Sequence, residues 1–178
     1  MMDLASMIIA ASNSLVPVFW LLLWSLGGLI GILYSGMALQ RMQSATIHPG
    51  RRPITLGGTL IVLIIGAAIF NLSKTISISW NTFADSSVSY GLISYSGADD
   101  FGRFKDAVNA VLSLAGLAGG FFSLKGLMCL KKATVDGESS RGSEDVSIKG
   151  ITHIVAGAAL VNVDKMIEAV RQTFHLYW

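Results

Sequence analysis

The chain has 178 residues, of which 52% are hydrophobic and only 13% carry a charge, whereas about 25% are charged in an ordinary soluble domain. This composition excludes a typical soluble protein and indicates a membrane protein. The formal net charge of +2 and the lack of a basic-aromatic cluster argue against direct sequence-specific binding to nucleic acid. The single cysteine excludes an internal disulfide.

Residues 1–16 are predicted to form an N-terminal segment lying at the membrane interface. A short helix over Met7–Leu15 is expected there, because the stretch is apolar but shorter than a span. We expect no secretory signal peptide, since no lysine or arginine precedes the apolar part.

Three stretches are long and apolar enough to cross a bilayer core, which takes about 20 residues. They are residues 17–39, the uncharged stretch between Arg52 and Lys74, and residues 107–124. Tryptophan is typical of the interfacial belt. We therefore expect three tryptophans in this belt: Trp20 and Trp24 near the start of the first span, and Trp80 after the second.

A fourth stretch, residues 150–163, is harder to assign from its hydropathy. It has only 14 residues between Lys149 and Asp164, and it contains a histidine and an asparagine. Its length alone fits a span or a buried or interfacial helix equally well.

An internal repeat decides between these alternatives. GAAIFNLSKTI at 66–76 matches GAALVNVDKMI at 157–167 in six of eleven positions, and SLGGLIG at 25–31 matches SLAGLAG at 113–119 in five of seven. GMALQRMQ at 36–43 aligns with GLMCLKKA at 126–133. Three blocks in the same order indicate a duplicated unit of a helix, a polar loop and a second helix.

The duplication predicts an all-α membrane protein with four transmembrane helices. They form two tandem helical hairpins, residues 17–80 and 107–178, joined by an extracytoplasmic connector at 81–106. Because each unit has an even number of spans, the two copies are parallel repeats with the same orientation.

Basic residues set the expected orientation, because lysine and arginine favour the cytoplasmic side. Those of the first hairpin loop are Arg41, Arg51 and Arg52, and those of the second include Lys131 and Lys132. We therefore expect both loops in the cytoplasm, and both termini and the connector outside.

Small residues recur four positions apart at matching places in the two halves. They are Gly27, Gly31 and Ser35 in the first half, and Ala115, Gly119 and Ser123 in the second. Close approach of helix backbones through small residues drives association in lipid. The pattern therefore predicts a packing face, either between the hairpins or between subunits in a homo-oligomer.

Two polar pairs stand out inside the apolar segments. Asn71 with Lys74 and Asn162 with Lys165 are each three residues apart, which places each pair on one face of a helix. Hydrogen bonding between helices or anchoring at the interface is the favoured role, and transport is the alternative.

No catalytic set, phosphate-binding loop or metal-ligand spacing is present, so an enzyme is not expected. No cofactor is expected either, although a bound phospholipid is compatible with an apolar bundle. A transporter or channel would need a titratable or pore-lining residue inside the bundle. The candidates are Lys74, Lys125, His153 and Asp164.

The two half-motifs LLLWSLGGLIGILYSGMALQRMQ and AVLSLAGLAGGFFSLKGLMCLKKA each run through a glycine-spaced span to a glycine and a basic end. This pattern resembles the small membrane proteins of type IVB secretion systems, the IcmC/DotE, IcmD/DotP and DotV group. With Thr173 and Phe174 near the end, it is most similar to the TraQ-like proteins of conjugative plasmids. The resemblance implies a bacterial inner-membrane component of a DNA-transfer apparatus, with other proteins of that system as partners and no catalytic residues.

Each half also resembles a conjugative pilin, a helical hairpin with a basic loop and both ends outside. That resemblance implies an extracellular pilus after assembly, with the loops facing its lumen. The expected function is thus a structural, oligomerising membrane subunit of a type IV conjugation system. The alternative is a small four-span transporter or channel.

Overall fold

The computed structural model describes residues 3–47, 56–84, 86–136 and 142–175. Within these ranges the chain is helical and contains no strand. Its main elements are α1 (Leu4–Ile47), α2 (Leu56–Phe70), α3 (Leu72–Asn81), α4 (Lys105–Asp136), α5 (Gly142–Val161) and α6 (Val163–Thr173). A 3₁₀ segment, η1 (Ser96–Phe104), precedes α4.

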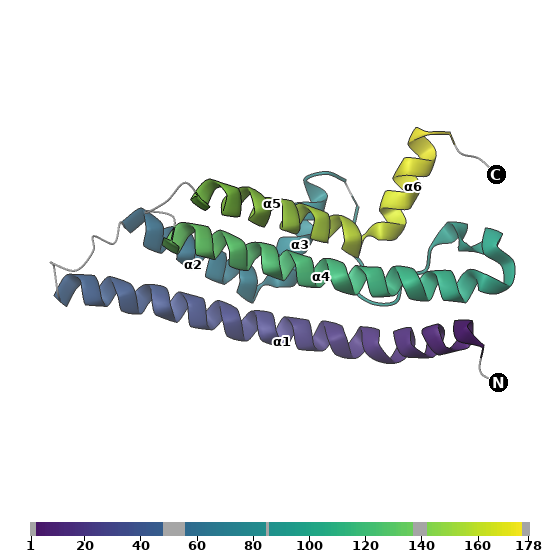
Figure 1. Cartoon of the computed structure of the whole chain (residues 1–178), viewed down its shortest axis with the longest axis horizontal. Coiled ribbons are helices and arrows are strands. Elements are labelled where there is room, and N and C mark those ends of the chain that lie inside the picture. The colour runs from purple at the N-terminus through teal and green to yellow at the C-terminus, as the bar shows by residue number, and fades with distance from the viewer. Residues whose placement is uncertain (1–2, 48–55, 85, 137–141, 176–178) are drawn as a thin grey trace.

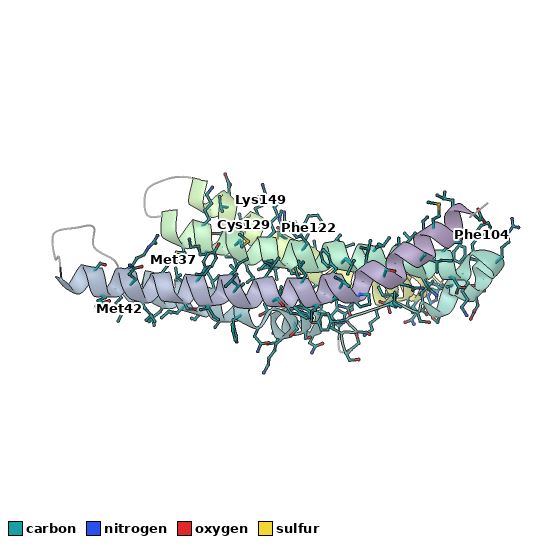
Figure 2. The ribbon with its side chains drawn as sticks, turned by 90° about the horizontal axis from the view of Figure 1, so that it is seen from below. Met37, Met42, Phe104, Phe122, Cys129 and Lys149 are labelled. Carbon is teal, nitrogen blue, oxygen red and sulfur yellow. The ribbon has the colours of Figure 1, made fainter. Side chains whose placement is uncertain are left out.

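Two antiparallel hairpins make up the bundle, α1 with α2 and α4 with α5 (Figure 1). The C-terminal ends of α1 and α4 and the N-terminal ends of α2 and α5 lie at one end of the bundle, here called the loop end, and α6 points away from the long helices (Figure 1). Figure 2 shows the same polarity, with Met42 and Lys149 towards the loop end and Phe104 at the opposite end. The predicted all-helical fold is therefore confirmed.

Among the described residues, two continuous helical stretches are long and apolar enough to cross a membrane, Leu4–Ser44 in α1 and Ser96–Thr134 in η1 and α4. The number rises to four if each of two bent pairs counts as one span. The bends come directly after α2, where α3 turns by 96°, and directly after α5, where α6 turns by 85°.

The N-terminal segment differs from the expectation of a separate interfacial helix. The helix predicted over Met7–Leu15 forms, but it continues without a break into the first apolar stretch, because α1 begins at Leu4 and includes Pro17. Figure 2 shows α1 bending towards its N-terminal end. A proline inside a helix removes one main-chain hydrogen bond and explains such a bend without ending the helix.

The core runs between the hairpins and collects aliphatic and aromatic side chains from both. Its most buried members include Leu23, Ile69, Leu72 and Ile76, together with Trp20 and Trp80. Many other large apolar side chains remain exposed on the outer faces of α1, α2 and α4. An apolar exterior around an apolar core is the arrangement expected of helices in lipid.

Candidate functional site

The small residues of the first hairpin lie between α1 and α2. A Cβ atom added at Gly31 would lie 2.6 Å from both the carbonyl oxygen of Gly66 and the amide nitrogen of Phe70. One added at Gly66 would lie 2.5 Å from the hydroxyl oxygen of Ser35. One added at Gly27 would lie 3.0 Å from the carbonyl oxygen of Ile69. The two backbones approach so closely that only glycine fits at Gly31 and Gly66 without displacement.

The second hairpin repeats this close backbone contact, here called the seam, between α4 and α5. A Cβ atom at Gly119 would lie 2.6 Å from the carbonyl oxygen of Gly157, and one at Gly157 would overlap the hydroxyl oxygen of Ser123. Gly126 and Gly150 form a further close pair nearer the loop, where each would bring a Cβ atom to within 3.0 Å of the other's carbonyl oxygen. Ala115 is half-buried one turn before Gly119.

The small-residue faces were expected between hairpins or between subunits, and the structure places them within each hairpin instead. The reason is that each face packs against a glycine on the other helix of the same hairpin, Gly66 on α2 or Gly157 on α5. In lipid such backbone contact supplies the packing that holds two helices together. These faces are therefore filled within the chain.

The predicted basic residues occupy different settings. Arg41 and Lys132 are exposed, whereas the Lys131 ammonium lies 4.7 Å from the centre of the Tyr34 ring. This cation–π contact joins α4 to α1 and so ties the two hairpins together near their loop ends. Arg51 and Arg52 lie outside the described residues.

Each asparagine–lysine pair begins at a bend between two helices and does not lie within one straight helix. Asn71 and Asn162 lie at the two bends, with non-helical φ/ψ of −108°/53° and −111°/40°. Lys74 and Lys165 belong to the following helices, which turn by nearly a right angle.

The two bends also differ in their surroundings. Asn162 is 1% exposed, and its amide nitrogen donates to the carbonyl oxygen of Ala158 at 2.9 Å. Asn71 is exposed, and there Thr75 closes the break by donating its hydroxyl to the carbonyl oxygen of Ala68 at 2.8 Å. Lys74 is exposed, whereas the Lys165 ammonium donates to the carbonyl oxygen of Ser87 in the connector. Lys165 thus joins α6 to the connector, and an anchoring role for Lys74 stays a prediction.

Sequence reasoning missed an aromatic cluster that fastens the connector to the bundle. Tyr90 packs edge-on against Trp20 and Trp24, which are themselves stacked with ring centres 5.0 Å apart. The Tyr90 hydroxyl donates to the carbonyl oxygen of Ser73 at 2.5 Å and lies 3.0 Å from the hydroxyl oxygen of Ser77. Burial raises the pKa of Tyr90 above its ordinary value of 10.0.

Two further polar contacts hold the connector on α4. The amide nitrogen of Ile93 donates to the Ser113 hydroxyl at 2.8 Å, and that of Tyr95 donates to the Asn109 side chain at 3.0 Å. The sequence predicted only a connector here, and the tyrosines among its serines were the available signal of packed positions. The connector thus forms part of the fold.

Replacing Tyr90 with phenylalanine should loosen the connector while leaving the bundle folded. The change keeps the ring contacts and removes two hydrogen bonds, each contributing about 1 kcal/mol. Hydrogen exchange at residues 86–95 should increase, whereas Tyr34→Phe, near the loop end, should leave it unchanged. Folding raises the pKa of Tyr90, so in the native chain its hydroxyl should keep its proton through the usual tyrosine range. As the pH rises further the hydroxyl ionises and can no longer donate to Ser73, and the stability that this contact contributes is lost. Equal exchange in the two variants would contradict the assignment.

The residues proposed for transport are not enclosed by the bundle. Lys74 and Lys125 are exposed, and His153 and Asp164 are half-buried. The His153 ring packs edge-on against Phe122, with ring centres 5.8 Å apart. Within the described ranges, no group of three or more potential metal-binding side chains is present.

A polar cavity of about 220 Å³ lies between the connector and the start of α6, with Asn162, Asp164 and Lys165 among its lining residues.

Comparison with known proteins adds no further guide to the site. No protein-family model, curated protein or solved structure matches the chain.

Proposed function

We propose that the chain is a structural subunit of a membrane assembly, with four spans arranged as two parallel hairpins. The observation that carries this proposal is the distribution of contacts. The glycine faces are filled within each hairpin, whereas large apolar side chains such as Leu29, Ile32 and Val111 are exposed on the bundle surface. Such a surface meets lipid or other subunits.

The membrane position that we propose follows from the aromatic and basic residues of α1. Arg41 follows Trp20 by 21 positions, which is about 31 Å of helix at 1.5 Å per residue. This length matches a hydrocarbon core of about 30 Å. The basic loop ends then lie in the cytoplasm, and α3, α6 and the connector lie near the outer interface together with Tyr90.

For the biological setting, we propose a type IV conjugation system of the bacterial inner membrane, with polymerisation into a pilus as a more specific hypothesis. Its support is the resemblance of the two glycine-spaced half-motifs to the TraQ-like group and to pilin hairpins. A structural role is favoured over a transporter or channel because none of Lys74, Lys125, His153 and Asp164 is buried in the bundle.

Shearing of cells that carry the native gene cluster tests this function. Deletion of the gene should abolish DNA transfer, and a plasmid copy should restore it. Blots of sheared filaments and inner membranes then locate the protein, with a known inner-membrane protein as the control. Signal in the filaments would support the pilin hypothesis, and signal only in the inner membrane would support a fixed component. Normal transfer without the gene would overturn the conjugation role.

A further inference from the structure

The two hairpins contact each other asymmetrically, although they are copies of one unit. In the described helices, α2 packs on α4, and α3 packs on both α4 and α5. The reverse pairings, α5 with α1 and α6 with α2, have at most marginal contact. A two-fold relation between the copies would make both sets. The relation is therefore head-to-tail, the kind that repeats indefinitely or closes into a ring.

The first copy packs against one face of α4, formed by Leu117, Gly120 and Leu124, all of which are buried. Gly120 marks its centre. A Cβ atom added there would lie 2.8 Å from side-chain atoms of both Trp20 and Leu23 of α1. Two large side chains of the first copy thus fill the space left by a glycine of the second.

The equivalent face of α1 is exposed in the part of the chain that the structure describes. The matching seam glycines Gly31 and Gly119 set the offset between α1 and α4 at 88 positions. With this offset, Leu117, Gly120 and Leu124 correspond to Leu29, Ile32 and Gly36. Leu29 is 57% exposed and Ile32 60% exposed, and a Cβ atom added at Gly36 would meet nothing within 4 Å.

The outward side of α4 is also open, and its shape complements that of α1. The equivalents of Trp20 and Leu23 there are two smaller residues, Val108 and Val111. Val111 is 52% exposed and Val108 half-buried. Within the chain, a tryptophan and a leucine face a glycine. Between chains, the two valines would face Ile32. The valines are smaller than Trp20 and Leu23, and Ile32 is larger than Gly120. The side-chain volume lost on one helix is therefore regained on the facing helix, as interdigitating helix surfaces require.

The bent helices α3 and α6 show the same asymmetry between the two copies. Both α3 and α6 touch the two long helices of their own hairpin, but α3 also packs on α4 and α5 of the other. Its Leu72, Ile76 and Trp80 are buried. No residue of α6 is buried, and its apolar Met166 and Val170 are exposed. The first copy thus packs its bent helix on the second copy, whereas the bent helix of the second copy has no such surface to pack on in the described chain.

We propose that a second copy of this chain supplies that partner, with its first hairpin docking on the α4–α6 side of the second hairpin. The contact repeats the internal one, so that Val111 of one subunit lies against Ile32 and Leu29 of the next. The proposal rests on the assembly role proposed above and specifies its interface. Successive subunits extend a row of alternating first and second hairpins, which either closes into a ring or continues as a filament.

Cysteine cross-linking of the full chain in native membranes tests this interface. In a Cys129→Ser background, the Ile32→Cys/Val111→Cys double variant is treated with a short thiol-reactive cross-linker. The controls are the two single-cysteine variants and a Leu26→Cys/Val111→Cys pair, because Leu26 is an exposed residue on a different side of α1. A ladder of dimers, trimers and larger products is expected only from the Ile32/Val111 pair.

Other outcomes separate the interface from the assembly role. Dimers from a single-cysteine variant would show that like faces meet, which overturns the head-to-tail contact. An equal ladder from the Leu26 pair would do the same. If the ladder is absent but the chain migrates as an oligomer in mild detergent, the interface is wrong and the assembly role stands. A monomer in native membranes would overturn both.

Discussion

Gly31→Ala is expected to destabilise the first hairpin by up to about 2 kcal/mol, a net of two opposing effects. Alanine is the better helix former by ~1 kcal/mol. Its Cβ atom, however, would lie 2.6 Å from two main-chain atoms of α2. Main-chain atoms cannot turn aside as a flexible side chain can, so α1 and α2 must separate, and overpacking of this kind costs about 1–3 kcal/mol. The steric term should therefore dominate.

Gly28→Ala provides a matched control on the same helix. It makes the same chemical change less than one turn away, where a Cβ atom would meet nothing within 4 Å. This variant should retain or gain stability, by at most ~1 kcal/mol. Unfolding of each purified variant by sodium dodecyl sulfate, followed by circular dichroism, compares them. Equal midpoints for Gly28→Ala and Gly31→Ala would show that the seam is not closely packed.

The seam in the second hairpin should respond in the same way. Gly119→Ala would place a Cβ atom 2.6 Å from the carbonyl oxygen of Gly157 and 2.7 Å from the amide nitrogen of Val161. Because this contact is a copy of the first, similar losses at Gly31 and Gly119 are expected. A loss at one site alone would mean that the two copies no longer share the same packing.

Much of the fold was accessible from the sequence, because its main signals are composition and repetition. The long apolar stretches predicted the helices, and the recurrence of Gly31 as Gly119 predicted equivalent packing. The pattern did not reveal which helix each face meets. Small residues indicate close approach, but the same stripe serves a hairpin neighbour or another subunit. Gly66 and Gly157 form the other half of these two helix contacts, and in the sequence they appeared only as equivalent positions of a repeat.

The bends escaped prediction for a different reason. Hydropathy averages over many residues, whereas each helix turns at one asparagine, Asn71 or Asn162. A polar residue in an apolar run suggests hydrogen bonding between helices, but at Asn162 the side chain bonds the main chain of its own helix, at Ala158. Asparagine competes for the backbone in this way and so favours helix ends. Its presence at both equivalent positions was the available signal.

The contact between the hairpins can be tested by exchanging its volumes. Trp20 is 6% exposed and adjoins Gly120. Because lipid is as apolar as the core, Trp20→Ala should lose mainly packing. A cavity on the order of 100 Å³ at about 24 cal/mol per Å³ corresponds to roughly 2 kcal/mol. Gly120→Ile should cost about 1–3 kcal/mol by overpacking against the indole ring.

The double variant Trp20→Ala/Gly120→Ile should be more stable than the sum of the single losses predicts. The isoleucine would occupy the space vacated by the indole, reproducing the small-against-large arrangement proposed between Val111 and Ile32 of successive subunits. Residues in contact couple by roughly 0.5–3 kcal/mol, whereas distant sites add. Unfolding midpoints of the four proteins in the same detergent give the coupling, and Trp20→Ala/Gly28→Ala serves as the uncoupled reference. Additive losses in the Gly120 pair would mean that the hairpins do not meet through complementary volumes, which would remove the physical basis for extending the same contact from one subunit to the next.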